Sequence, residues 1–173
     1  MGKKCIIFVT FLLVSFTGGF YFFYSIFDQN IEHCAFCNPN VLETQKFYED
    51  DLILALYTHK PVLPGHCLVV PKRHVERFES LTNEEISQIG KVIKKVNQAV
   101  GKAFDSSSYL ILQKNGIEVG QWVPHVHFHY VPRKKGGIST FRFILKMCMA
   151  NTKGPIAKSE MKKNVDKLKQ TIK

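Results

Sequence analysis

The sequence predicts an α+β domain that follows an N-terminal transmembrane helix. Three observations support this fold class: an uncharged apolar run near the N-terminus, several short segments typical of strands, and one long amphipathic helix pattern between them. The chain has 173 residues, 45% of them hydrophobic, with 14 phenylalanines. This length and apolar content fit one ordinary domain with added segments, and they exclude a chain that is disordered throughout.

The N-terminal run covers residues 5–27 (CIIFVTFLLVSFTGGFYFFYSIF) and contains no charge. As a helix it would extend roughly 34 Å, which is enough to cross a bilayer core of about 30 Å. A cleaved signal peptide is the alternative, but the run is longer than a typical signal core and no A-x-A-like site follows it. We therefore predict a single-pass membrane anchor at residues 1–29. Lys3 and Lys4 favour a body outside the cytoplasm by the positive-inside rule.

The body is expected to begin near Cys34. Segments 52–57, 66–70, 109–113 and 123–131 read as strands bounded by Pro, Gly and charged residues. A long helix is predicted to start at Thr82, because Thr82 and Glu85 have the spacing of a capping box and apolar residues then recur on one stripe as far as Phe104. A second, basic helix is predicted near the C-terminus, where apolar residues recur every three to five positions: Ile156, Met161, Val165, Leu168 and Ile172.

The charge is concentrated at the C-terminal end. The chain has 24 Lys and Arg against 14 Asp and Glu, a net charge of +10, yet residues 133–173 hold 12 of the basic residues and only two acidic ones. The rest of the chain is neutral, so a nucleic-acid partner over the whole surface is not expected. A basic C-terminal segment with an amphipathic helix is predicted at residues 141–173. Two interpretations of the basic end stay open: an amphipathic helix packed on the body, or contact with anionic lipid beside the anchor through Arg133, Lys134, Lys135, Arg142 and Lys146.

The histidines of the last predicted strand are the sharpest local feature. Because side chains alternate along a strand, His125, His127 and His129 are predicted to share one face. Three core histidines are disfavoured, since each buried imidazole needs hydrogen-bond partners. A three-histidine metal site and nucleophilic catalysis remain. Neighbours on one strand face stand about 7 Å apart at Cα, which makes a shared metal ion awkward and favours a division of roles.

Two segments resemble the histidine triad (HIT) superfamily of nucleotide hydrolases and transferases. Residues 120–133 read GQWVPHVHFHYVPR and residues 60–78 read KPVLPGHCLVVPKRHVERF, and the likeness is greatest to the diadenosine polyphosphate hydrolase branch. The resemblance implies a HIT-like fold at residues 30–140, with an antiparallel sheet of about five strands, one long helix and a C-terminal helix. It also implies a homodimer that continues the sheet across its two-fold axis.

The resemblance further implies a covalent mechanism. His127 would attack the α-phosphorus of a nucleotide and hold a nucleotidyl-histidine that water then hydrolyses. His129 would donate to the phosphate or to the leaving group, Gln121 would position the α-phosphate, and His66 would support the triad from a neighbouring strand. Members that transfer nucleotides carry Gln at the third position, so His129 favours hydrolysis.

Three positions bear on the substrate. Lys114 stands where the family usually has Asn or Gln, and it is expected to pair with a polyphosphate or to point to solvent. Thr58 stands where the hydrolase branch often has a ribose contact. Trp122 replaces a Ser or Thr that could contact phosphate. Mg²⁺ is expected to accompany a polyphosphate substrate.

Cys34 and Cys37 form a C-x-x-C pair with three interpretations: half of a zinc site, a redox pair, or two unrelated thiols. His74 and His125 can complete a Cys2His2 set, and the resemblance favours a structural zinc site of this kind.

For the whole protein, the hypotheses are a membrane-tethered dinucleoside polyphosphate hydrolase, a nucleoside phosphoramidase with the same nucleophile, and a nucleotide-binding adaptor of weak activity.

Overall fold

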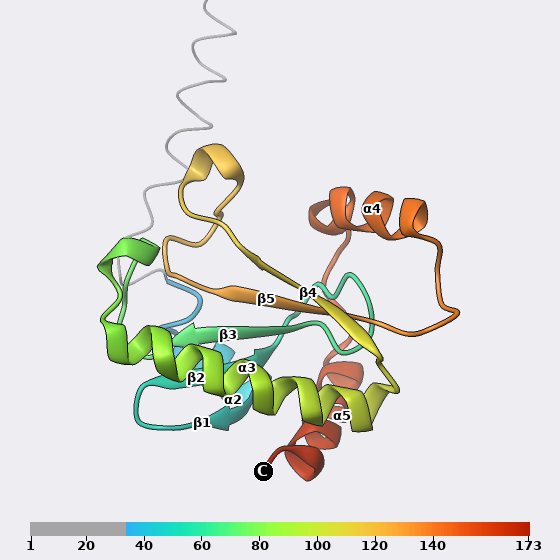
Figure 1. The fold of residues 1–173 in the computed structure, drawn as a ribbon, viewed down its shortest axis with the longest axis horizontal. Helices are drawn as coiled ribbons and strands as arrows, with labels where there is room; N and C mark the ends of the chain where they lie inside the picture. Colours follow the sequence, from blue (N-terminus) through green and yellow to red (C-terminus); the bar gives the residue numbers. More distant parts are fainter. Residues whose placement is uncertain (1–33) are drawn as a thin grey trace, which may run out of the picture.

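A computed structural model describes residues 34–173 of the protein (Figure 1). Its centre is a five-stranded antiparallel sheet in the order β1-β2-β3-β5-β4. The strands are β1 (Lys46–Glu49), β2 (Ile53–Tyr57), β3 (Cys67–Pro71), β4 (Ser108–Gln113) and β5 (Phe128–Arg133). The helices are α2 (Pro39–Gln45), α3 (Asn83–Phe104), α4 (Thr140–Cys148) and α5 (Lys158–Thr171). The predicted α+β domain, with its sheet, its long helix and its C-terminal helix, is confirmed.

The two faces of the sheet bury different side chains, because successive strand residues point to opposite sides. One face packs against α3 and α5, which lie on the same side of the sheet in Figure 1, and its core includes Ile53, Tyr57 and Val69. The other face packs against the segment that begins at Cys34, through Leu54, Leu56, Leu68 and Val70. His129 pairs with Leu68 across β3 and β5 and therefore lies on this second face. The sheet thus separates the two helices from the functional histidines.

Helix α3 begins where its capping box predicts. The Thr82 hydroxyl accepts a hydrogen bond from the Glu85 N–H at 3.1 Å, and the Glu85 carboxylate accepts one from the Thr82 N–H at 2.8 Å. The stripe from Ile89 to Val100 is buried against the sheet. The helix ends at Phe104, and its C-cap, Asp105, adopts a left-handed conformation with φ of 56°. The start and the buried face of this helix are confirmed.

Three short elements were not predicted. Helix α2 and strand β1 follow each other directly at residues 39–49, and α4 follows β5. Each spans nine residues or fewer, which is too short for periodicity to separate a helix from a loop. A local signal existed for α2, because Asn38 caps it and Pro39 occupies its first position.

The predicted strand at residues 123–131 begins only at Phe128. Residues 123–125 bend, with the His125 N–H donating to the Val123 carbonyl at 2.8 Å, and the Val126 N–H donates to the Val75 carbonyl at 2.6 Å. These bonds take the backbone out of the sheet ladder before β5. The expectation that three histidines lie on one strand is therefore wrong, because only His129 belongs to β5, and the His125 side chain lies beside Cys34 and Cys37.

The transmembrane part of the predicted fold class, and with it the predicted single-pass membrane localisation, needs correction. Within residues 34–173, no helix combines the length and the apolar character that a bilayer crossing requires. Helix α3, with 22 residues, has the length but carries charged residues along its exposed side. The predicted anchor at residues 1–29 falls outside the described residues.

The basic C-terminal helix is confirmed as α5. It buries Met161, Val165 and Leu168 in the core that it shares with α3 and the sheet, and its lysines are exposed to solvent. Helix α4 differs, because it buries Phe143 but leaves Phe141 76% exposed. The amphipathic packing interpretation therefore holds for α5.

Candidate active site and metal centre

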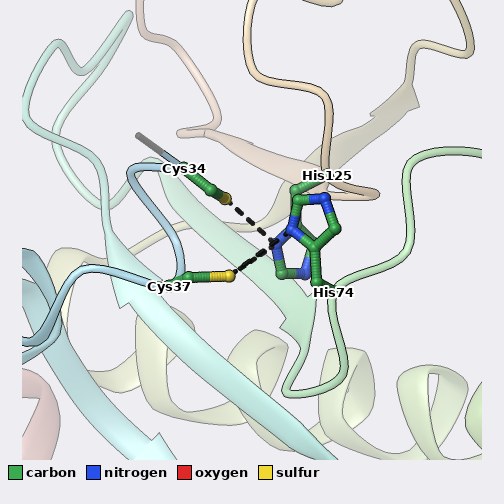
Figure 2. Close-up of side chains that lie close together, drawn as sticks. All are labelled: Cys34, Cys37, His74 and His125. Atoms are coloured by element: carbon green, nitrogen blue, oxygen red, sulfur yellow. Dashed lines mark hydrogen bonds between the residues drawn. The ribbon is translucent and has the colours of Figure 1, made fainter. Parts of the chain in front are cut away.

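Cys34, Cys37, His74 and His125 converge from three separate segments of the chain (Figure 2). Cys34 Sγ lies 3.3 Å from His125 Nδ1, and Cys37 Sγ lies 3.5 Å from His74 Nδ1 and 3.7 Å from His125 Nδ1. All four ligand atoms lie within 4.8 Å of one another. The structure thus brings together the four residues of the predicted zinc set, which we call the metal cluster.

The metal cluster has the donor set of a tetrahedral zinc site. Zinc bonds of about 2.0 to 2.3 Å place neighbouring ligand atoms roughly 3.3 to 3.8 Å apart, and the three distances above lie in this range, while the other pairs of ligand atoms are at most 4.8 Å apart. The Nε2 of His125 bonds to the Pro71 carbonyl at 2.9 Å, so its Nδ1 is the lone-pair nitrogen that faces the sulfurs. Burial and the neighbouring Cys34 raise the pKa of the Cys37 thiol to about 11. A bound cation would offset this cost by stabilising the thiolate.

The donors of this cluster bear on which metal it could hold. Among the described residues it is the one group of His, Cys, Asp or Glu that could hold a metal ion, and its donors are sulfur and nitrogen. Magnesium prefers oxygen donors. The expectation of Mg²⁺ with the substrate therefore has no support from this cluster.

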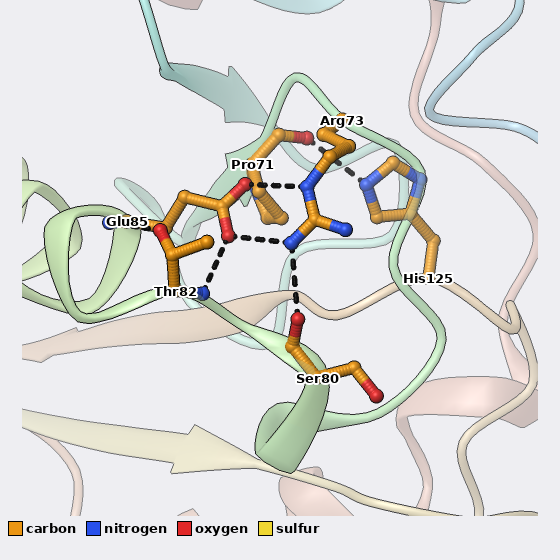
Figure 3. Close-up of polar contacts among 6 residues, drawn as sticks. All are labelled: Pro71, Arg73, Ser80, Thr82, Glu85 and His125. Atoms are coloured by element: carbon orange, nitrogen blue, oxygen red, sulfur yellow. Dashed lines mark hydrogen bonds and ion pairs between the residues drawn. The ribbon is translucent and has the colours of Figure 1, made fainter.

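The loop that carries His74 is held to the start of α3 (Figure 3). Arg73 donates to both carboxylate oxygens of Glu85, at 3.0 and 2.7 Å, and to the Ser80 carbonyl at 3.0 Å. Glu85 is 3% exposed and is also part of the capping box of α3. The Glu85 carboxylate therefore joins the start of α3 to the loop between Pro71 and Ser80. This segment supplies the His74 ligand and also the Pro71 carbonyl, which orients the His125 ring.

A second group, His66, His127 and His129, lies on the same face of the sheet, and we call it the catalytic cluster. His66 Nε2 is 3.0 Å from His129 Nδ1, and the rings of His127 and His129 are 5.0 Å apart. These three side chains line a cavity of about 460 Å³ together with residues of the N-terminal and β2–β3 segments. The cavity gives a small molecule access to the imidazoles.

The hydrogen bonds of the catalytic cluster assign its protons. His127 Nδ1 lies 2.7 Å from the His125 carbonyl, which can only accept, so Nδ1 carries the proton and Nε2 has the free lone pair. His66 Nδ1 accepts from the Val62 N–H at 3.1 Å, so its Nε2–H donates to His129 Nδ1. The remaining nitrogen of neutral His129, Nε2, then carries a proton. The cluster therefore offers a nucleophile on His127 and a hydrogen-bond donor on His129.

Burial keeps these histidines neutral. It lowers the pKa of His66 to about 4, with a smaller effect from His127. Burial is also the largest cause of the low pKa of His129, about 2, and the charges of His127, His66 and Lys114 add to it. For His127 burial lowers the pKa, and the bond to the His125 carbonyl opposes that shift. All three are unprotonated bases at neutral pH, as a nitrogen nucleophile must be.

Two of the three predicted substrate contacts line the cavity. Thr58 and Lys114 both do so. Gln121 does not line it, because its side chain is buried in backbone contacts: its carbonyl accepts from the Gly116 N–H at 2.7 Å and its amide donates to the Glu76 carbonyl at 2.8 Å. These bonds give Gln121 the geometry of a brace between two loops.

Phe36 and Val62 are site residues that the sequence reasoning missed. The ring of Phe36 lies 5.1 Å from that of His127 and 5.8 Å from that of His125, so it packs between the two clusters. Val62 contributes only its backbone N–H, which sets the tautomer of His66. The position of Phe36 inside the C-x-x-C pair was a usable signal, whereas a backbone donor leaves no mark on residue identity.

Comparisons with known proteins find a matching family and similar sequences. The family model described as "HIT domain" matches residues 40–136, more than half of the chain. The bis(5'-nucleosyl)-tetraphosphatase (asymmetrical) of Schizosaccharomyces pombe is 43% identical over 96 residues, which cover 56% of this chain and 53% of that protein. An adenosine 5'-monophosphoramidase of the same organism is 36% identical over 102 residues, which cover 58% of this chain and 74% of that protein. The chain thus spans about half of the first relative's length.

Solved structures share the fold. The crystal structure of a zinc-bound histidine triad family protein from Mycobacterium smegmatis superimposes with a TM-score of 0.63 at 22% identity. The match covers 82% of this chain and 94% of that one. At this identity the likeness concerns the arrangement of the elements.

Proposed function

Because the chain belongs to the HIT domain family, we propose that it hydrolyses dinucleoside polyphosphates through a covalent nucleotidyl-histidine. The single observation that carries this proposal is the pair of ring nitrogens beside the cavity, the free Nε2 of His127 and the protonated Nε2 of His129. A 43% identical relative is named as a tetraphosphatase of this substrate class.

In the first step the Nε2 lone pair of His127 attacks the α-phosphorus, and the bond from phosphorus to the bridging oxygen breaks. Its electrons leave with a nucleoside polyphosphate. The Nδ1–H of His127 stays bonded to the His125 carbonyl, which stabilises the positive charge of the substituted imidazole. His129 donates its Nε2–H to the oxygen where charge develops, and His66 holds the His129 ring in the donating tautomer.

In the second step a water molecule attacks the same phosphorus and breaks its bond to His127 Nε2. A nucleoside monophosphate is released, and the water's proton passes to solvent. The imidazole is a fair leaving group because its nitrogen returns to a neutral lone pair. The net reaction is hydrolysis of one phosphoanhydride bond, and the free histidine is restored.

Zinc, in this proposal, is held by Cys34, Cys37, His74 and His125 and has a structural role. When bound, it ties the N-terminal segment to the loop after β3 and to the bend before β5. The distances of the metal cluster and the hydrogen bond from His125 to the Pro71 carbonyl support it. Gln121, which braces neighbouring loops, acts on the cavity through their position.

We also propose a homodimer that pairs the β4 edges of two sheets. Strand β4 is a terminal strand of the sheet, and Tyr109 and Leu110 on it are 46% and 40% exposed. Edge strands with exposed apolar side chains favour pairing with a second copy.

Nucleoside phosphoramidate hydrolysis is the second candidate function. The same His127 and His129 would act on a bond from phosphorus to nitrogen, and a 36% identical relative is named as a monophosphoramidase. A nucleotide-binding adaptor is disfavoured, because a protein that only binds has no need for a histidine nucleophile beside a histidine hydrogen-bond donor.

Trapping the adduct tests the proposal. The full-length protein is mixed briefly with a dinucleoside tetraphosphate, quenched in alkali, which preserves phosphorus–nitrogen bonds, and examined by peptide mass spectrometry. A nucleoside monophosphate adduct on the peptide that contains His127 is expected, and it should be absent from a His127→Ala variant. Turnover without an adduct in the wild-type protein would contradict the covalent mechanism.

A further inference from the structure

The charged side chains that line the cavity beside the catalytic cluster are basic. Within the described part of the chain, its lining includes Lys60 and Lys114 and contains no aspartate or glutamate. The two lysines therefore give the lining a fixed positive charge. A cavity of this kind favours ligands that carry several negative charges.

Lys114 is the lysine that reaches the reacting histidines. It is half-buried at the end of β4, and its ammonium donates to the Gly120 carbonyl at 3.3 Å. It directly follows Gln113, which pairs with Phe128, the residue between His127 and His129, and it lines the cavity together with both histidines. The ammonium has three N–H donors and gives one of them to the Gly120 carbonyl.

Gly120 makes this approach feasible. Its φ is +80°, a left-handed conformation that favours glycine, and a Cβ placed there would lie 3.3 Å from Lys114 Nζ. A side chain at this position would therefore press on the ammonium. The loop is shaped so that the lysine lies along it and over the cavity.

We propose that Lys114 selects substrates by the charge of their leaving group, favouring nucleoside polyphosphates over amines. This inference rests on the proposed function, because it assumes attack by His127 on an α-phosphorus. It assigns to this residue a role that separates the two candidate reactions of the same site.

The chemistry of the two leaving groups differs. When a phosphoanhydride bond breaks, the electron pair stays on an oxygen of a polyphosphate that already carries negative charges, and a nearby ammonium stabilises it without proton transfer. When a phosphoramidate bond breaks, the leaving nitrogen must take up a proton from solvent, and the neutral amine that departs gains nothing from a fixed positive charge. Neutralising Lys114 should therefore slow the first reaction and spare the second.

The experiment compares full-length wild-type protein with Lys114→Gln, Lys114→Arg and Lys91→Gln. Lys91 is an exposed lysine of α3, on the opposite side of the sheet, and its variant makes the same change in net charge. For each protein, kcat/KM is measured with a dinucleoside tetraphosphate and with a nucleoside phosphoramidate of the same base.

In Lys114→Gln we expect kcat/KM to fall about 10- to 100-fold for the tetraphosphate, the loss typical of a removed hydrogen bond to a charged group, and less than about 3-fold for the phosphoramidate. Lys114→Arg should retain the wild-type ratio of the two values, as should Lys91→Gln. An equal loss for both substrates, or no loss for either, overturns the inference.

Product binding decides the inference even if turnover is absent. In the His127→Ala background, Lys114→Gln should weaken the affinity for a nucleoside triphosphate about 10-fold or more and leave that for the nucleoside monophosphate nearly unchanged. Equal effects on the two nucleotides contradict the role of Lys114. If instead the wild-type protein cleaves neither substrate while this binding difference persists, the proposed function fails and the charge preference stands.

Discussion

The metal cluster and the catalytic cluster lie next to each other on one face of the sheet, yet their ring nitrogens meet different surroundings. In the metal cluster the Nδ1 atoms of His74 and His125 face two sulfurs that lie 3.3 to 3.7 Å away. In the catalytic cluster His127 and His129 border a cavity of about 460 Å³. The first arrangement closes around an ion, and the second leaves room for a molecule.

The difference shows that burial alone does not assign a role to a histidine. Burial is the largest cause of the lowered pKa in both groups, to about 4 for His125 and for His66. The two groups differ in where the unprotonated ring nitrogen of each histidine points. In His125, His127 and His66 a backbone group binds one ring nitrogen and so determines which nitrogen carries the proton. Variants that affect one cluster and spare the other can therefore break or sharpen this comparison.

Removal of the nucleophile should have the largest effect. His127→Ala is expected to lower kcat by about 10³-fold or more, because it removes the Nε2 lone pair that attacks phosphorus in the proposed mechanism. Its zinc content, measured by elemental analysis, should equal that of the wild-type protein. Loss of zinc in this variant would show that the two clusters are not separable.

Removal of a metal ligand should have the next largest effect, on stability. Cys34→Ser is expected to abolish zinc binding and to lower Tm by about 5 to 15 °C, since a structural ion contributes to folding free energy. Cys148→Ser, at an exposed cysteine outside the cluster, is the matched control and should change neither value. Wild-type zinc content and Tm in Cys34→Ser would remove the zinc proposal.

The pH dependence of stability should report on His66. Its pKa is about 4 in the folded protein and near 6.5 when unfolded, so between these values the unfolded chain binds the extra proton. This contribution to stability is complete above pH 6.5 and is lost as pH falls toward 4, up to about 3 kcal/mol.

Unfolding by denaturant from pH 4 to 8 measures this slope. His66→Gln should flatten it, because glutamine does not titrate. An unchanged slope in the variant would mean that the pKa of His66 is the same in the folded and the unfolded protein, which contradicts the prediction.

Weakening the Arg73–Glu85 ion pair beside the metal cluster should have the smallest effect. Glu85→Gln weakens the paired hydrogen bonds to Arg73 and the charge at the start of α3, and we expect Tm to fall by a few degrees and zinc affinity by a few-fold. Glu79→Gln removes the charge of an exposed pair with Arg77 and should leave both values unchanged. Equal effects of the two variants would deny Glu85 a special role.

Much of the fold was predictable because its longest elements have regular patterns. The capping box at Thr82 and the stripe that follows located α3, and strands β2, β3 and β4 lie within one residue of the predicted segments at each end. Helix α4 and strand β1 span too few repeats of their periods to be recognised from the sequence. The start of β5 was misplaced because alternation continues through residues 123–127, where the backbone bonds to Val75 instead of to a strand.

The site was predictable in its residues and less so in its contacts. The motif identified His127, His129 and His66, and the C-x-x-C pair with His74 and His125 indicated the metal cluster. Gln121 shows the limit: a motif fixes which residue is present but not where its amide points, and here backbone groups of Gly116 and Glu76 bind it. Contacts made by backbone atoms, such as the Val62 N–H, are invisible in a residue pattern.

The His125 carbonyl has a consequence for how this site tolerates mutation. The side chain of His125 belongs to the metal cluster, but the atom that holds the proton on His127 Nδ1 is its backbone oxygen. Every amino acid has that oxygen, so no codon change at position 125 deletes it. A lineage could exchange or lose the metal ligand here and still inherit the acceptor that keeps the nucleophile's other nitrogen free.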